Sequence, residues 1–135
     1  MATVLKEIIY KDFDIRFTAH PVTGKLIIKK NSDSVKQALK NLILTSFYER
    51  PYAPLFGSDI RSMLFENYTA VTESNIRYAI ETCIENFEPR VQLLDIRFGG
   101  DPDRNMLTIS IIFRPLNSRA SVTLGIDLER VRWKV

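Results

Sequence analysis

The acidic residues of this 135-residue sequence are the ones that could most directly act as catalytic groups. A glycosidase needs two carboxyl groups about 5–10 Å apart, one on each side of the bond that is cleaved. The chain has 16 acidic residues, so such pairs arise by chance, and none is flanked by the apolar or aromatic neighbours typical of a catalytic acid. We therefore interpret six acidic residues of the helical half as solvated helix faces: Glu49, Asp59, Glu66, Glu81, Glu85 and Glu88.

The sequence contains few residues for nucleophilic or metal chemistry. His20 is the only histidine and lies in a predicted turn before Pro21, so no imidazole is expected beside a nucleophile. Cys83 is the only cysteine and falls on the apolar stripe of a predicted helix, where a thiol is inert. The five glycines are scattered and form no phosphate-binding loop. The sequence therefore predicts no catalytic residues, no metal site and no cofactor.

Charge and hydropathy bear on the kind of partner. The net charge of +3 implies nucleic-acid binding only where basic residues cluster. The best cluster is the C-terminal "LERVRWKV", with Arg130, Arg132, Trp133 and Lys134, but acidic residues adjoin it and we interpret it as a polar tail. No stretch approaches the roughly 18 apolar residues of a membrane span, and the opening "MATVLKEIIYKD" is too short and interrupted for a signal peptide. We expect no nucleic acid, membrane or small-molecule substrate as a partner, and a location in the cytoplasm or in a particle assembled there.

Two stretches are not explained by solvation alone, and the first is a loop rich in proline and aromatic residues. It reads "YERPYAPLFGSDIRSMLFEN" and spans residues 48–67. Loops are usually hydrophilic, so we expect Tyr52, Leu55 and Phe56 to pack either under the domain or against a partner. Both alternatives stay open for the residues that we single out here: Arg50, Pro51, Tyr52, Phe56 and Gly57.

The second stretch is the tripeptide Glu88-Pro89-Arg90, between a predicted helix and a predicted strand. Pro89 fixes a rigid exit from the helix, which would hold Glu88 and Arg90 in a reproducible orientation. A guanidinium offers a planar fork of donors to a partner's carboxylate or carbonyl groups. The alternative interpretation is plain helix termination by proline.

The elements that position these stretches form a single domain, residues 1–135, of the α+β class. Alternation of Phe13, Ile15 and Phe17 with polar residues predicts a half-buried strand, which "AHPVTG" connects to a second strand at residues 25–30. Apolar residues at helical spacing predict a helix from an N-cap at Ser34, with Gln37 completing a capping box, as far as Phe47.

The rest of the chain is predicted to form two more helices and three strands. A short helix is expected over residues 59–66, and a longer one runs from a cap at Thr72 to the residues before Pro89. Period-two alternation then predicts strands over residues 94–98, 107–113 and 122–128. Short turns between consecutive strands favour antiparallel pairing, so about three helices should pack on one face of the C-terminal sheet while the other face stays wetter.

Taken together, these stretches resemble the baseplate wedge and sheath-initiator family of contractile phage tails, which includes a baseplate component of type VI secretion systems. The resemblance rests on "VKQALKNLILTSFYERPYAPLFGSDIRSMLFEN" followed by "IRYAIETCIENFEPRV". Its motifs are the arginine-proline-aromatic stretch leading to Phe56-Gly57, then "LFEN", then Glu88-Pro89-Arg90. One departure is Tyr48, where the family usually has a glycine, so the loop after the first helix is expected to differ locally.

The resemblance implies a non-enzymatic structural protein of a virion tail baseplate. Glu88, Pro89 and Arg90 would contact the helical core bundle of the wedge proteins. The C-terminal sheet, roughly residues 91–130, would accept strands of a sheath subunit along the edge formed by Val122, Leu124, Ile126 and Leu128. The implied partners are the wedge proteins and the tail sheath protein, with the tail tube as a further candidate.

Two alternatives remain open beside this hypothesis. Members of the family have carried a lysozyme label, so a muramidase with Glu49 or Glu88 as its essential carboxylate is one. The other is a regulatory adaptor of the same fold that binds a different host protein.

Overall fold

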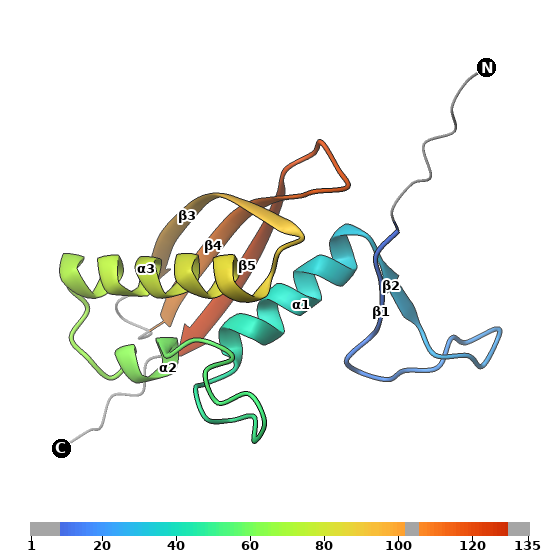
Figure 1. The fold of residues 1–135 in the computed structure, drawn as a ribbon, viewed down its shortest axis with the longest axis horizontal. Helices are drawn as coiled ribbons and strands as arrows, with labels where there is room; N and C mark the ends of the chain where they lie inside the picture. Colours follow the sequence, from blue (N-terminus) through green and yellow to red (C-terminus); the bar gives the residue numbers. More distant parts are fainter. Residues whose placement is uncertain (1–8, 102–105, 130–135) are drawn as a thin grey trace.

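A computed structural model describes residues 9–101 and 106–129. An N-terminal hairpin of β1 (Lys11–Phe13) and β2 (Ile28–Lys30) precedes three helices, α1 (Ser32–Leu44), α2 (Ile60–Met63) and α3 (Ala70–Phe87). The chain ends in β3 (Val91–Asp101), β4 (Met106–Pro115) and β5 (Val122–Glu129). The three long strands form one antiparallel sheet in the order β3-β4-β5, and the helices cover one of its faces (Figure 1). The predicted α+β architecture is confirmed.

The core lies between the helices and the inner face of the sheet. Alternate residues of β4 point inward and are fully buried, among them Ile109, Ile111 and Phe113. They meet an apolar stripe of α1, which includes Leu39, and one of α3, which includes Ile80. Each buried aliphatic or aromatic side chain contributes about 1.5–3 kcal/mol through removal from water, so this layer is the main source of stability.

The predicted strand phase is wrong for Leu94, because β3 contains a bulge. Leu93 pairs with Phe113, and the next pair is Asp95 with Ile112, so Leu94 is the extra residue. A bulge shifts the alternation by one residue. Leu93 and Ile96 therefore both face the core, whereas Leu94 is 47% exposed.

Both predicted helix caps are wrong by about one turn. The first helix begins at Ser32, after Asn31, which leaves Ser34 buried inside the helix. The third begins after Thr69, whose extended backbone lets its side chain accept a hydrogen bond from the Thr72 amide. Thr72 instead donates its hydroxyl to the Asn67 carbonyl at 2.8 Å, inside the first turn.

Two predicted helices are also longer than the observed ones. The first ends at Leu44, because Thr45 takes an extended conformation, so Phe47 lies in the loop and is 41% exposed. The second spans Ile60–Met63 rather than residues 59–66.

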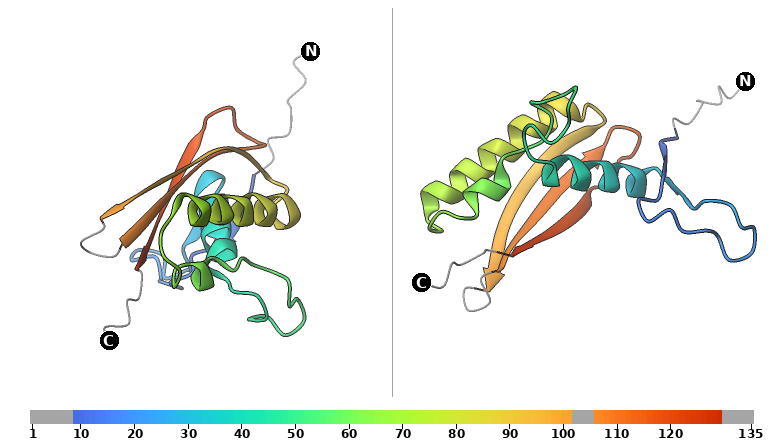
Figure 2. Two further views of the ribbon diagram at one scale, coloured as in Figure 1. Left: turned by 90° about the vertical axis from the view of Figure 1, so that its left-hand side faces the viewer. Right: turned by 90° about the horizontal axis from the view of Figure 1, so that it is seen from below.

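The hairpin projects from one end of the helix–sheet body (Figures 1 and 2). Its strands are shorter than predicted, because the chain turns at residues 14–17 and Phe17 adopts a positive φ of 49°. Phe13, Ile15 and Phe17, which were expected to be half-buried, are each at least 55% exposed. No helix within the described part of the chain is long and apolar enough to cross a membrane.

Candidate functional site

The corner between α3 and β3 is built around a buried carboxylate. Glu88 follows the last residue of α3 and is only 6% exposed. Its Oε1 accepts a hydrogen bond from Arg90 Nε at 2.7 Å, and its Oε2 accepts one from Arg90 Nη2 at 2.9 Å. Pro89, between them, is exposed. The pair has the bidentate geometry that makes guanidinium–carboxylate contacts strong and directional.

Arg90 also connects this corner to the hairpin and to the β4–β5 turn. Its guanidinium carbon lies 5.3 Å from the centre of the Tyr10 ring, and its carbonyl accepts a hydrogen bond from the Leu116 amide at 2.9 Å. The hydrogen bond to Glu88 raises the pKa of Arg90, so the guanidinium stays charged. The donor fork that was expected to face a partner is thus largely occupied within the chain. Pro89 and the exposed third of the Arg90 side chain remain accessible.

The proline-rich loop after α1 is fixed by Phe56 and Gly57. The guanidinium carbon of Arg50 lies 4.1 Å from the Phe56 ring centre, and the Phe56 and Phe87 rings pack edge to face at 5.1 Å. Gly57 has a φ of +113°, and a Cβ there would lie 2.2 Å from the Thr45 carbonyl oxygen. This close approach of two backbone segments requires glycine.

The outer half of the same loop faces solvent. Tyr52 is fully exposed, Leu55 is 66% exposed and Pro51 is exposed, so of the residues expected to pack under the domain or against a partner, only Phe56 packs under the domain. Tyr48 takes a positive φ of 64°, and its amide donates to the Pro54 carbonyl at 2.7 Å. The tyrosine therefore occupies a left-handed conformation that glycine adopts without strain.

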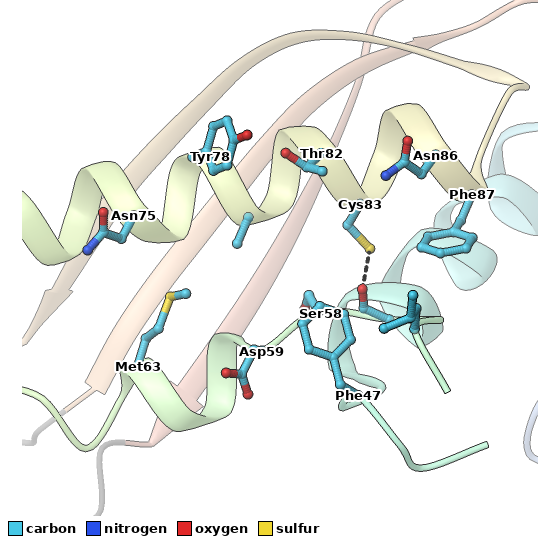
Figure 3. Close-up of a pocket in the computed structure, with 13 residues that line it drawn as sticks. Phe47, Ser58, Asp59, Met63, Asn75, Tyr78, Thr82, Cys83, Asn86 and Phe87 are labelled. Carbon is cyan, nitrogen blue, oxygen red and sulfur yellow. Dashed lines mark hydrogen bonds between the residues drawn. The ribbon is translucent and has the colours of Figure 1, made fainter. Parts of the chain in front are cut away.

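A largely apolar hollow of about 680 Å³ lies between this loop, α2 and α3 (Figure 3). Cys83 points toward the loop at its floor and donates its thiol hydrogen to the Gly57 carbonyl, at an Sγ–O distance of 3.1 Å. Burial raises the pKa of Cys83 to about 11, which keeps the thiol protonated. Sequence reasoning missed this hollow, although one signal was present. Four polar or aromatic residues recur at helical spacing along one side of α3: Asn75, Tyr78, Thr82 and Asn86.

β5 is one of the two borders of the C-terminal sheet, and β3 is the other. Among the described strands β5 pairs only with β4, through a regular register from Met106–Glu129 to Phe113–Val122. Leu124, Ile126 and Leu128 point into the core, as the alternation predicted, whereas the residues between them are exposed. The accessible part of this edge is therefore its backbone and its solvent-facing side chains rather than the apolar residues named from the sequence.

The remaining candidates have hydrogen-bond partners that fit structural roles. Glu49 is exposed and accepts a hydrogen bond from the Ser46 amide at 2.8 Å, while Glu88 is buried against Arg90. This arrangement gives the muramidase alternative no support. Nδ1 of His20 accepts from the amides of Val22 and Thr23, which fits a turn role. The C-terminal cluster of Arg130, Arg132, Trp133 and Lys134 lies outside the described residues. Within the described residues, no group of three or more candidate ligands could hold a metal ion.

Comparison with known proteins identifies the family. The model of the family described as "Baseplate wedge protein gp25" matches residues 29–118, which run from β2 through α1, α2, α3, β3 and β4. The chain belongs to this family. The baseplate wedge protein gp25 of Enterobacteria phage T4 is 33% identical over 85 residues, which make up 63% of this chain and 64% of the phage protein. The chain thus matches a little less than two thirds of that relative's length.

Solved structures show the same fold. The baseplate of the anti-feeding prophage contains a chain with 26% identity and a TM-score of 0.71, covering 82% of this chain and 89% of its own. A protein of Geobacter sulfurreducens described as a candidate tail lysozyme matches with a TM-score of 0.72 at 19% identity, covering 78% of this chain and 96% of its own. A chain in the postcontracted baseplate of pyocin R2 gives 0.59 at 18% identity, covering 84% of this chain and 97% of its own. The predicted resemblance to baseplate proteins of contractile systems is confirmed, and the matched wedge motifs all fall within residues 29–118.

Proposed function

We propose that this baseplate wedge family member is a structural adaptor in the baseplate of a contractile tail or injection device, assembled in the bacterial cytoplasm. It binds the core bundle of the wedge proteins through the corner at residues 88–90 and starts sheath polymerisation along β5, with the tail tube as a further candidate neighbour. The observation that carries the proposal is that no second described strand pairs with β5, in a chain of this family.

The β5 edge has the chemistry that strand addition needs. Half of the backbone amides and carbonyls of an edge strand lack a ladder partner and can bond to an incoming strand. The eight residues of β5 are long enough for a stable ladder. The opposite border is less suited, because the bulge at Leu94 interrupts β3. Strand addition is therefore favoured on β5.

The corner supports the second contact through its rigidity. Glu88 holds Arg90 in one orientation, so the exposed third of the Arg90 side chain and Pro89 form a fixed feature on the surface. A preorganised side chain loses less conformational entropy on binding than a free one. The exposed loop residues Tyr52 and Leu55 extend the accessible surface on the helical side of the molecule.

Hydrogen–deuterium exchange tests the sheath contact with the unmodified protein. Amides of residues 122–129 that do not bond to β4 should exchange quickly in the free chain and become protected when sheath protein is added. The β3 segment, residues 91–101, is the control, since it is the other border of the same sheet. New protection confined to β3, or to neither border, would reject the strand-addition proposal.

Binding to purified wedge proteins tests the corner. Arg90→Ala should weaken binding about 30-fold, corresponding to roughly 2 kcal/mol, as expected for a hot-spot arginine. Arg97→Ala is the matched control, because that side chain is 72% exposed on the neighbouring strand. The binding titrations are run under conditions in which urea unfolding shows that each variant is folded. Equal affinities for wild type and Arg90→Ala would show that the corner is not the wedge contact.

A further inference from the structure

The hairpin carries a surface that the proposed function does not use. Residues 9–31 contain five lysine or arginine residues and two aspartates, a surplus of three that equals the net charge of the whole chain. The same segment exposes large apolar side chains, including Ile15, Phe17 and Val22, at 55% to 86%. A small ribbon that is both basic and apolar, and that projects from the body, is an unusual surface for a chain whose remaining residues balance in charge.

One face of this ribbon is turned to solvent. Directly opposite residues of an antiparallel pair share a face, and the register pairs Lys11 with Lys30 and Phe13 with Ile28. All four side chains are exposed, Phe13 to 55% and Ile28 to 49%. The other face differs, because Lys29 there forms an ion pair with Asp14 at 3.8 Å and lines a hollow against α1. We refer to the four residues Lys11, Phe13, Ile28 and Lys30 as the lysine face.

The lysine face is held in a defined orientation. Gln37 of α1 donates to the Phe13 carbonyl at 2.6 Å and accepts from the Ile15 amide at 3.2 Å. The Asn31 amide donates to the Tyr10 carbonyl at 2.7 Å, and the Tyr10 ring lies beside Arg90. The base of the hairpin is therefore fixed to both α1 and the corner. A fixed surface of this kind docks with a smaller entropy loss than a mobile arm.

We propose that the lysine face docks on a partner protein surface that presents an apolar side chain flanked by carboxylates. Two like charges directly opposite each other destabilise a strand pair, so Lys11 and Lys30 repel each other in the free chain. A carboxylate placed between them removes this repulsion, while the partner's apolar group covers Phe13 and Ile28. A nucleic acid is a poorer match, because Ile28 gives no stacking surface and two lysines bind few phosphates. An anionic membrane is also a poorer match, because two lysines attract it only weakly.

The partner is sought among baseplate proteins, and in this respect the inference rests on the proposed function. The decisive variant is Lys11→Glu, which replaces a like-charged cross-strand pair by an opposite-charged one. If the lysine face has no role beyond the hairpin itself, Lys11→Glu should leave both the stability of the free chain and its incorporation into baseplates unchanged or increased. If the face docks on carboxylates, the free chain keeps or gains stability in urea, while its incorporation into baseplates falls about tenfold in competition with wild type.

A matched control and a contact map complete the experiment. Lys40→Glu changes the net charge equally on the exposed surface of α1 and should alter incorporation less than twofold. A photo-crosslinking residue at position 13 of the full chain in purified baseplates should label a peptide rich in apolar and acidic residues, and one at position 65 serves as the control, since Phe65 is 61% exposed.

The outcomes distinguish failure of the docking inference from failure of the proposed function. If the wild-type chain enters baseplates and the Lys11→Glu variant is incorporated equally well, the docking inference alone is overturned. Cross-linking of position 13 to a second copy of this chain, or to a segment without carboxylates, also overturns it. Binding of the free chain to phosphatidylserine vesicles or to a 20-base-pair DNA at physiological salt, abolished by Lys11→Glu, overturns the choice of a protein partner. Exclusion of the wild-type chain from baseplates overturns the proposed function and the choice of partner together.

Discussion

Replacement of Glu88 by glutamine tests whether the corner is held by its ion pair. Removing one member of a buried pair costs about 3–5 kcal/mol, because the other charge loses its compensation. Two features of the structure reduce this figure. Arg90 is 33% exposed, so water can solvate part of its charge, and glutamine retains one oxygen for the Nε donor. We expect Glu88→Gln to lower the free energy of unfolding by about 2 kcal/mol.

Urea unfolding followed by far-ultraviolet circular dichroism measures this loss. With a denaturant slope of roughly 2 kcal/mol per molar, the midpoint should fall by about 1 M at an unchanged slope. Glu85→Gln is the matched control, since Glu85 is exposed on the same helix, and its midpoint should correspond to a change of less than about 0.5 kcal/mol. Equal midpoints for Glu88→Gln and Glu85→Gln would refute the reasoning that the corner depends on a buried ion pair.

Three further predictions concern the loop, the cap and the thiol. Gly57→Ala should lower the free energy of unfolding in urea by about 3 kcal/mol or more, because the new Cβ clashes with the Thr45 carbonyl. Gly24→Ala, at a positive φ in open space, should lower it by only about 1 kcal/mol. Similar losses for the two variants would contradict the clash. Thr69→Ala should lower the free energy of unfolding by about 1 kcal/mol, because α3 loses its N-cap. Ser74→Ala, inside the helix, is the control and should be neutral or slightly stabilising. A neutral effect of Thr69→Ala would argue against the cap. Burial raises the pKa of Cys83 to about 11, so the unfolded chain releases the thiol proton at a lower pH than the folded chain does. The contribution of the thiol to the free energy of unfolding is therefore complete below pH 9 and is lost as the pH approaches 11. The stability difference between wild type and Cys83→Ala should therefore fall by about 1 kcal/mol between pH 8 and pH 10 in urea titrations, and a constant difference would show that the thiol is not buried in solution.

The sequence predicted the element order because hydrophobic periodicity follows burial directly. The stripe of α3 and the alternation of Leu124, Ile126 and Leu128 both reflect side chains that face one core, and both are confirmed. Leu94 was misplaced because a bulge depends on the pairing of β3 with β4, which alternation within one strand does not reveal. The hairpin residues were misplaced for a similar reason. Apolar alternation predicts burial only where another layer lies above the strand, and the hairpin projects beyond the body.

The site was only partly predictable for physical reasons of the same kind. Glu88, Pro89 and Arg90 were singled out, but their pairing depends on how the chain leaves α3, and the ring of Tyr10 comes from the other end of the sequence. The caps were misplaced because Ser34 and Thr72 are both good capping residue types and only backbone conformation distinguishes a cap from a buried helical position.

The geometry of the corner explains why it contains a proline between two opposite charges. In a continuous helix, residues two apart point in different directions and cannot pair. Pro89 disfavours the helical conformation of Glu88, which instead has φ −129° and ψ 78°. Only after this change of direction can the guanidinium of Arg90 reach both oxygens of Glu88. The guanidinium of the same arginine lies beside the Tyr10 ring at the base of the hairpin, and its carbonyl accepts a hydrogen bond from the Leu116 amide of the β4–β5 turn. The corner therefore sets the position of the hairpin relative to the turn that precedes β5. A loss of wedge binding in Arg90→Ala is therefore assigned to the corner itself only when the exchange of the hairpin amides is unchanged.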